Sequence, residues 1–170
     1  MNKPARKPLP HSQKVLSLRE AVTTAKRLRK SGKKLVTTNG CFDLLHVGHA
    51  RSLAFARSQG DVLFVGLNSD ASVRANKGIG RPVVPARERA EMLAALSFVD
   101  YVFIFTTKTP IPWLLEIKPH IHVKSSDYTI EQVIEREAVE RGGGKVVLAP
   151  HTGKHSTSGI IKKIRSTKGN

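Results

Sequence analysis

Hydrophobic and polar positions alternate between two spacings along this chain. Short apolar runs, typical of strands buried on both faces, lie at residues 34–38, 62–67, 101–105, 121–123 and 145–148. Apolar residues recur at helical spacing between these runs, at residues 47–58, 87–96, 110–117 and 130–141, and again near 158–165. Strands that alternate with helices predict a parallel sheet covered by helices.

Helix caps support several of these boundaries. The segment SLRE at residues 17–20 is a capping box, and it begins a helix over residues 17–32 that Gly32 ends. Thr109 precedes a proline, as an N-cap followed by a first helical residue would, and TIEQ at residues 129–132 is a second capping box.

The expected fold is α/β, a Rossmann-like, doubly wound, five-stranded parallel sheet with helices on both faces. Residues 14–170 form one domain in this interpretation, and residues 1–13 form a disordered basic lead. In such sheets ligands bind beyond the carboxyl ends of the strands. The polar residues that follow these ends are Asn39, His46, Asn68, Asp70, Lys124, Asp127 and the segment 151–158.

Positive charge is concentrated in the two ends of the chain. Its formal net charge is +16, of which residues 1–34 carry +10, residues 151–170 carry +5 and residues 35–150 only +1. Such ends attract polyanions, whether nucleic acid or nucleoside triphosphate, or they form a solvated fringe without a specific partner. Nucleic acid is the less favoured partner, because aromatic side chains do not interleave with the basic ends.

Length and composition exclude other classes of protein. A chain of 170 residues suffices for one domain with a core. No apolar run approaches the roughly 20 residues that span a bilayer, so we expect no membrane partner. Cys41 is the single cysteine, which rules out an internal disulfide and favours a cytoplasmic protein.

The strongest chemical signal is TNGCFDLLHVGH at residues 38–49, where a strand ends and a helix begins. Gly40 lets the backbone turn tightly, and the helix N-terminus supplies free N–H groups and a partial positive charge. His46 and His49 are three residues apart, on neighbouring sides of the first helical turn, and Gly48 keeps this surface open. Two imidazoles placed there can donate to phosphate oxygens, as phosphoryl or nucleotidyl transfer requires.

Two other interpretations of these histidines stay open. Cys41, His46 and His49 could bind zinc, although a fourth ligand is not evident and the spacing fits no standard site. Both histidines could instead be structural, but packing explains poorly why two histidines flank a glycine at a helix start.

The same segment resembles the signature of the HxGH cytidylyltransferase-like nucleotidyltransferases, which are distant relatives of class I tRNA synthetases. The resemblance runs from about Val15 to Ile164 and includes GDVLFVGLNSDASVRANKGIGRPVVPARERAEMLAAL, VDYVFIF, VKSSDY and HSTSGIIKKI. Among the subfamilies, the chain is most similar to the adenylyltransferases that make ADP-heptose from heptose 1-phosphate, a lipopolysaccharide precursor. Residues 17–32 also resemble the segment that precedes this domain in a bifunctional kinase–adenylyltransferase, whose kinase half has no counterpart in this sequence.

The resemblance implies roles for the matching residues. His46 and His49 would bind the triphosphate and stabilise the pentacoordinate α-phosphorus, while Gly40 and Phe42 would offer backbone N–H groups to the phosphates. Lys77, in a loop before two glycines, would be a mobile lysine that closes on the phosphates. Taken alone, Lys77 and Arg89 are better explained as solvated surface charges, an interpretation that the resemblance makes less favoured. The further nucleotide-binding candidates are Asn39, Arg89, Lys124, Ser156 and Thr157.

The acceptor side is where the chain departs from the family pattern. Asp43 would face the acceptor, and the family has Gly-Gly where this chain has Ser125 and Ser126. The family's Ser-Thr-Thr becomes Ser-Thr-Ser at residues 156–158, which keeps the hydroxyl group. The remaining substrate-binding candidates are Asp127, Asn68 and Asp70, of which the last two are equally well explained as turn-forming residues.

The expected reaction is direct in-line attack by a phosphate oxygen of the acceptor on the α-phosphorus of a Mg²⁺-bound nucleotide. We expect AMP transfer from ATP to heptose 1-phosphate with release of pyrophosphate, with no metal ligand from a protein side chain and no covalent intermediate. The alternatives are a CTP-dependent cytidylyltransferase acting on glycerol 3-phosphate or a similar phospho-alcohol, and a non-catalytic nucleotide- or RNA-binding module. A homodimer is compatible with this sequence.

Overall fold

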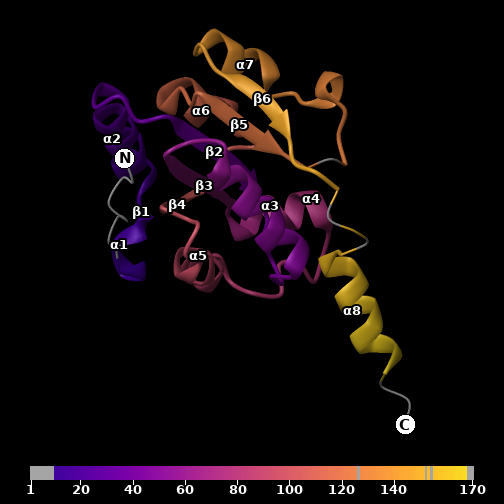
Figure 1. Cartoon of the computed structure of the whole chain (residues 1–170). Helices are drawn as coiled ribbons and strands as arrows, with labels where there is room; N and C mark the ends of the chain where they lie inside the picture. The colour runs from indigo at the N-terminus through magenta and orange to yellow at the C-terminus, as the bar shows by residue number, and fades with distance from the viewer. Residues whose placement is uncertain (1–9, 126, 152, 154, 168–170) are drawn as a thin grey trace.

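The sheet at the centre of Figure 1 contains six parallel strands, one more than the hydrophobic pattern predicts. The computed structural model describes residues 10–125, 127–151, 153 and 155–167. The strands lie in the order β1-β4-β3-β2-β5-β6, which confirms the Rossmann-like α/β fold and corrects the number of strands. Their bounds are β1 Val15–Leu16, β2 Leu35–Gly40, β3 Val62–Asn68, β4 Tyr101–Phe105, β5 Ile121–Lys124 and β6 Lys145–Leu148.

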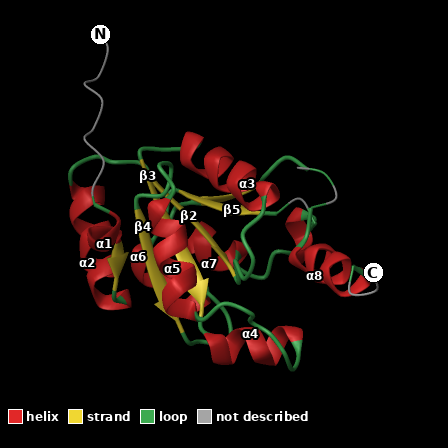
Figure 2. Cartoon of the chain, turned by 90° about the horizontal axis from the view of Figure 1, so that it is seen from below, coloured by secondary structure: helices red, strands yellow, loops and turns green. Residues whose placement is uncertain are grey.

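Helices cover both faces of this sheet (Figure 2). Side chains alternate along β3, so that Leu63 and Val65 pack in the layer with α3 and α5, whereas Val62 and Phe64 pack with α2, α6 and α7. The last helix, α8, extends away from the sheet in both views, and none of its residues is buried. The helices are α1 His11–Lys14, α2 Leu18–Lys30, α3 Val47–Ser58, α4 Asp70–Lys77, α5 Ala86–Ala95, α6 Ile111–Ile117, α7 Arg136–Arg141 and α8 Thr157–Ser166, with a short 3₁₀ helix, η1, at Ile130–Gln132.

The strand order changes direction at β2. From β2 the chain builds β3 and β4 on one side, and it then returns to place β5 and β6 on the other side. The crossovers that leave β2 and β5 therefore run to opposite sides, which opens a crevice beyond the carboxyl ends of these two neighbours. The sequence motif at residues 38–49 begins at the end of β2, next to this crevice.

Two elements carry too weak a sequence pattern to be predicted. The strand β1 has only two residues, which pair with Val102 and Phe103 of β4 and are too few to show a period. The helix α4 replaces the expected loop, and Val73 is its single buried residue, so it has no apolar stripe. Its N-cap is Ser69, whose hydroxyl accepts from the N–H of Ser72.

The helix expected over residues 130–141 is interrupted. The capping box at residues 129–132 forms as predicted, but it caps only η1, and α7 begins later at Arg136. Val133 and Glu135 are both buried between them, with exposed fractions of 3% each. Residues two apart point about 200° apart on a continuous helix, so the break lets both side chains face inward.

The capping box predicted at the start of α2 is confirmed. Ser17 and Glu20 form it, with the Ser17 N–H 2.8 Å from Glu20 Oε2. In the expected lead, residues 1–9 lie outside the described residues, and the short helix α1 at His11–Lys14 was not predicted. The helix α6 begins at Ile111, Pro110 before it has αR geometry, and no side chain caps this end. Within the described residues, no helix is long and apolar enough to cross a bilayer.

His122 is a fully buried titratable residue in the middle of the sheet. Its Nδ1 lies 2.8 Å from the hydroxyl of Thr37 on β2, and its Nε2 has no hydrogen-bond partner among the described residues. Burial, together with the smaller effect of the Lys124 charge, lowers the pKa of His122 to about 3. The folded protein therefore holds this imidazole neutral.

Stability should consequently fall with acid below the unfolded pKa of 6.5. Between pH 6.5 and pH 3, His122 binds a proton in the unfolded chain but not in the folded protein. Its contribution to the free energy of unfolding is therefore complete above pH 6.5 and falls by up to about 1.4 kcal/mol per pH unit toward pH 3. His122→Asn can keep the bond to Thr37 but does not titrate. Urea unfolding at several pH values should therefore show a shallower pH slope for this variant, and equal slopes would contradict burial of a neutral imidazole.

Candidate active site

A cleft of about 630 Å³ lies at the carboxyl ends of β2, β3 and β5. It brings together most of the residues predicted from sequence: Asn39, Gly40, Phe42, Asp43, His46, His49, Asn68, Lys77, Lys124, Ser125, Asp127, Ser156 and Thr157. Arg89 and Asp70 are not part of its lining, and Ser126 lies outside the described residues.

The two motif histidines stack on each other at the start of α3. Their ring centroids are 3.8 Å apart and their planes 21° from parallel, with His46 as the N-cap and His49 in the first turn. Phe42 packs edge-on against His49 at 5.2 Å between ring centroids. The Nδ1 atoms of both histidines are buried and have no hydrogen-bond partner among the described residues. Such atoms call for a partner, which a ligand in the cleft can supply.

Both imidazoles are held neutral. Burial lowers the pKa of His49 to about 4, and His46 adds to this effect. Burial also lowers the pKa of His46, and the charge of His155 lowers it further. A neutral imidazole has one N–H to donate, and an arriving triphosphate would raise both pKa values because it favours the charged form.

Gly48 separates the histidines for a packing reason. A Cβ built at Gly48 would lie 3.0 Å from the ring of His46 and 3.2 Å from Cβ of His155. The missing side chain therefore lets His46 and His155 approach the start of α3. Sequence analysis did not select His155, although it directly precedes the Ser-Thr pair at residues 156–157.

The backbone of this turn offers unpaired donors to the cleft. None of the N–H groups from Phe42 to His49 donates to another described residue, and the first that does is that of Ala50, to the carbonyl oxygen of His46. These donors lie at the positive end of α3, so their position favours an anion. Phe42 has φ = 43°, a left-handed conformation that a non-glycine residue adopts only where its surroundings impose it.

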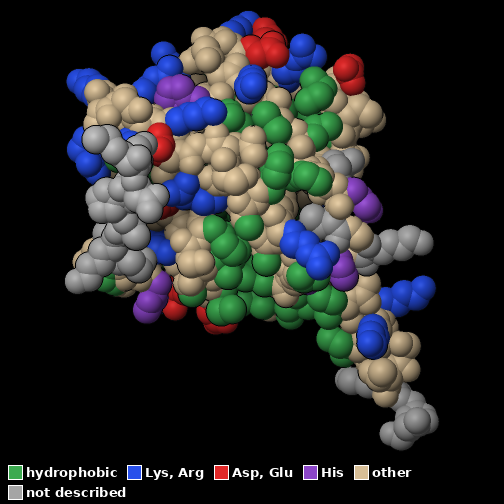
Figure 3. Space-filling view, viewed as in Figure 1, with side chains coloured by type: hydrophobic (Ala, Val, Ile, Leu, Met, Phe, Trp, Pro, Cys, Tyr) green, Lys and Arg blue, Asp and Glu red, His purple; other side chains and the backbone are tan. Residues whose placement is uncertain are grey.

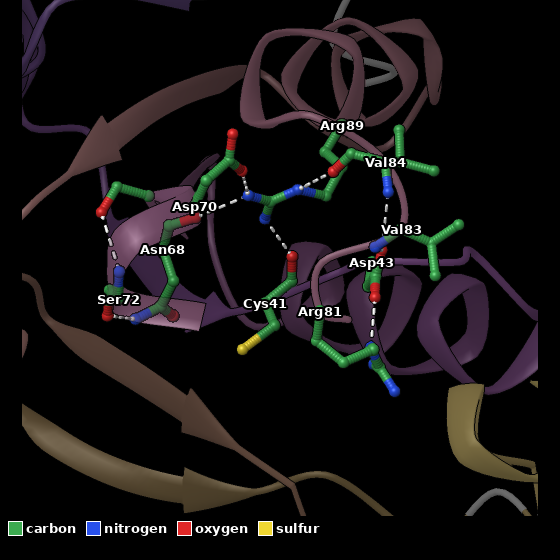
Figure 4. A network of polar contacts seen from close by, with 10 residues as sticks. Cys41, Asp43, Asn68, Asp70, Ser72, Arg81, Val83, Val84 and Arg89 are labelled. Carbon is green, nitrogen blue, oxygen red and sulfur yellow. Dashed lines mark hydrogen bonds and ion pairs between the residues drawn. The ribbon is translucent and has the colours of Figure 1, made fainter. Parts of the chain in front are cut away.

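Asp43 holds a neighbouring loop in place (Figure 4). Its carboxylate accepts from Nε of Arg81 at 2.5 Å and from the N–H groups of Val83 and Val84 at 2.8 and 3.0 Å. The side chain of Asp43 is 1% exposed. Asp43 lines the cleft as expected, but its oxygens bind the loop, so its contact with an acceptor stays a prediction.

Arg89 lies behind the cleft and not in its lining, so its expected place near the substrates stays a prediction. It is 1% exposed, and its guanidinium donates to the carbonyl oxygens of Cys41, Asn68 and Val84 (Figure 4). Asp70, a candidate for substrate binding, accepts from Nη2 of Arg89 at 2.6 Å. Asn68 does line the cleft, and its side-chain amide donates to the hydroxyl of Ser72 at 2.9 Å.

Lys124 is paired inside the cleft wall. Its Nζ lies 2.8 Å from Oε1 of Glu135, 3.4 Å from Oδ1 of Asn39 and 5.4 Å from the ring centroid of Tyr128. Glu135 therefore balances the charge that Lys124 would otherwise offer to a phosphate. Next to it, the hydroxyl of Ser125 donates to Asp127 at 2.9 Å, so this serine is engaged with its own loop.

Two cationic side chains of the cleft stay without an ion-pair partner in the described part of the chain. Lys77 is the last residue of α4, followed by Gly78 with φ = 87°, and Lys108 follows β4. Arg81 and Lys124, in contrast, are paired with carboxylates. At the opposite wall, Ser156 caps α8 and Thr157 donates to the carbonyl oxygen of Leu44 at 3.2 Å. The lining residues that sequence analysis missed include Arg81, Lys108, Tyr128, Ile134, Glu135 and His155.

The described residues contain no group of three or more His, Cys, Asp or Glu side chains that could hold a metal ion. This geometry disfavours the zinc interpretation, because Cys41, His46 and His49 do not converge. Burial also raises the pKa of the Cys41 thiol, which keeps it protonated at neutral pH and unsuited to act as a nucleophile. On the face shown in Figure 3, basic side chains lie along the top and the left edge, in the middle and on α8, with other side chains between them.

Comparison with known proteins defines the class to which this fold and site belong. The sequence model of the Cytidylyltransferase-like family matches residues 37–168. The chain therefore belongs to this family. The solved structure of a lipopolysaccharide core biosynthesis protein from Thermoplasma volcanium has the same fold, with a TM-score of 0.59 and 26% identity over 69% of this chain and 94% of that protein.

Among curated relatives, the chain is similar to bifunctional protein HldE of Geotalea uraniireducens, with 49% identity over 90% of this chain and 31% of the relative. HldE of Geobacter sulfurreducens is 49% identical over 83% of this chain and 29% of its own length. The chain thus spans about a third of the curated relatives that it matches.

The neutral state of His49 can be measured directly. In NMR titration of the free protein, its ring signals should stay those of neutral imidazole from pH 8 to pH 5 and should change near pH 4, because burial lowers its pKa. Inorganic tripolyphosphate should raise this pKa. A midpoint at 6 or above in the free protein would contradict the burial of this ring.

Proposed function

We propose that this protein transfers the AMP group of ATP to a sugar phosphate, heptose 1-phosphate, and releases pyrophosphate. A phosphate oxygen of the acceptor attacks the α-phosphorus of the nucleotide and forms the new P–O bond. The bond from that phosphorus to the oxygen bridging to the β-phosphate breaks, and pyrophosphate leaves with the electron pair. The acceptor phosphate is ionised at neutral pH, so the reaction needs no general base.

One observation carries this proposal: two neutral, stacked imidazoles stand beside a run of unpaired N–H groups at the start of α3. Fixed donors of this kind stabilise the charge that spreads over a phosphoryl group in its transition state. Lys77, at the end of α4, and Lys108, after β4, add two cations that have no carboxylate partner among the described residues. The site therefore favours a polyanion whose reacting phosphorus lies next to the histidines.

The divalent ion belongs to the substrate in this proposal. The cleft carboxylates of Asp43 and Glu135 are engaged by Arg81 and Lys124, and the described residues contain no cluster of metal ligands. Mg²⁺ would enter bound to the phosphates of ATP, and protein residues would bind and align that complex.

The acceptor is assigned from similarity. The resemblance to adenylyltransferases that make ADP-heptose and the HldE relatives support heptose 1-phosphate and ATP. Ser125 occupies the acceptor-side wall where the family has glycine, and its side chain occupies space there. This substitution is the observation that keeps glycerol 3-phosphate with CTP as the second candidate, because a narrower wall suits a smaller acceptor.

Pyrophosphate release with a panel of substrates tests the proposal. ATP, CTP, GTP and UTP would each be combined with heptose 1-phosphate or glycerol 3-phosphate in the presence of Mg²⁺. We expect ATP with heptose 1-phosphate to give the highest kcat/KM. His46→Ala or His49→Ala should reduce turnover by at least ~100-fold, the usual effect of losing a transition-state donor. His11→Ala, outside the cleft, is the matched control. Absence of pyrophosphate release from every pair, or near-normal turnover of both cleft variants, would refute the proposed function.

Lys77 should act mainly in the transition state, because a charge at the end of α4 beside Gly78 can close on the phosphates. Lys77→Ala should lower kcat by more than it weakens ATP binding measured by calorimetry. Arg74→Ala removes the same charge from an exposed position of α4 outside the cleft lining and should change neither value. Equal losses in kcat and affinity for Lys77→Ala would make it a simple binding residue.

A further inference from the structure

We propose that Arg89 is a positioning residue that aims the backbone N–H of Phe42 at the triphosphate and does not itself contact the nucleotide. This inference rests on the proposed function, since it takes the anion in the cleft to be a nucleoside triphosphate. It assigns Arg89 a role different from the direct contact that family resemblance implies.

All three guanidinium nitrogens of Arg89 are occupied by protein acceptors. Each of its three guanidinium nitrogens donates to a protein acceptor: Nε to Val84, Nη1 to Cys41, and Nη2 to Asn68 and Asp70 (Figure 4). Its side chain is completely buried, and it is absent from the cleft lining. The carboxylate of Asp70 also balances its charge. Arg89 therefore has neither access nor net charge to offer to a phosphate in the cleft.

The three peptide groups whose carbonyl oxygens accept from Arg89 differ in whether they have an N–H group that is free to bind a ligand. A planar trans peptide points its C=O and its N–H in opposite directions, so fixing the oxygen also fixes the hydrogen. The peptide after Val84 has no N–H, because Pro85 follows. In the peptide after Asn68, the N–H of Ser69 already donates to Phe105 at 3.0 Å. Only the peptide between Cys41 and Phe42 combines a carbonyl held by Arg89 with an N–H that no other described residue accepts.

The position of Arg89 also fixes the direction in which the N–H of Phe42 points. Cys41 and Phe42 line the cleft, while Arg89 holds the Cys41 carbonyl from behind. The N–H of Phe42 consequently points away from Arg89, toward the cleft side of the turn. Phe42 is also in the left-handed conformation, which an unanchored turn would abandon. Arg89 thus supplies the fixed orientation that makes a backbone amide useful as a phosphate donor.

Calorimetric titration with inorganic tripolyphosphate tests this chain of contacts without a base, an acceptor or turnover. One variant replaces the Phe42 amide by an ester, by incorporation of the corresponding α-hydroxy acid, which removes the N–H and leaves the Cys41 carbonyl oxygen, a weaker acceptor, for Arg89. A second is Arg89→Gln, with the exposed Arg87→Gln of the same helix as control. We expect the ester and Arg89→Gln each to weaken binding by about tenfold or more, the usual range for a hydrogen bond to a charged group, and Arg87→Gln to bind as the wild type.

The double variant separates positioning from direct contact. If Arg89 acts through the Phe42 N–H, combining the ester with Arg89→Gln should cost little more than either change alone. Losses that multiply would show that Arg89 acts on the anion independently, and this would overturn the proposal. Unchanged tripolyphosphate affinity in the ester variant, which lacks the Phe42 N–H, would also overturn it. Arg89→Lys replaces Arg89→Gln in the cycle if circular dichroism shows that the latter does not fold.

These outcomes are separate from those of the proposed function. Tripolyphosphate can bind with the expected coupling in a protein that releases no pyrophosphate, in which case the reaction fails and the positioning role stands. If pyrophosphate is released but the losses of tripolyphosphate affinity multiply in the double variant, the proposed reaction stands and the positioning role fails.

Discussion

The connection between β2 and α3 leaves backbone donors without partners among the described residues, and the proposed site depends on this. The first N–H groups of a helix have no partner within the helix, and the N-cap of α3, His46, makes no side-chain cap bond. None of the N–H groups from Phe42 to His49 donates to another described residue, and Phe42, Asp43, His46, Gly48 and His49 line the cleft. The proposed anion binding thus follows from how the backbone makes the connection, and the histidines add side-chain donors to it.

The ionisable groups around this connection are either paired with an opposite charge or left neutral or unpaired in the cleft. Behind the cleft, Asp70 neutralises Arg89, and in the cleft wall Asp43 neutralises Arg81 while holding the loop that leads into α5. In the cleft, burial keeps His46 and His49 neutral, and Lys77 and Lys108 stay free of carboxylates in the described part of the chain. The result is a site whose positive potential comes from oriented dipoles and a few cations, which suits alignment and charge neutralisation better than covalent chemistry.

Sequence reasoning was most successful where local pattern and chemistry coincide. The motif at residues 38–49 contains its strand end, glycine turn and helix start in one short segment, so its position and its donors follow from local rules. Arg89 shows the limit of that reasoning, because the sequence does not say in which direction its side chain points. Its acceptors are backbone carbonyls of distant residues, and these carry no sequence signal. The pairing of Lys124 with Glu135 was also missed, because the break between η1 and α7, which was not predicted, places Glu135 against the sheet.

The central claim is that the cleft directs chemistry to the α-phosphorus of ATP, and isotope transfer tests it most directly. The purified protein would be incubated with heptose 1-phosphate and ATP that is ³²P-labelled at either the α or the γ position. The account predicts that the α label appears in the sugar nucleotide and the γ label in pyrophosphate. A γ label on the sugar, or an α label that stays in free nucleotide while the acceptor is unchanged, would contradict it.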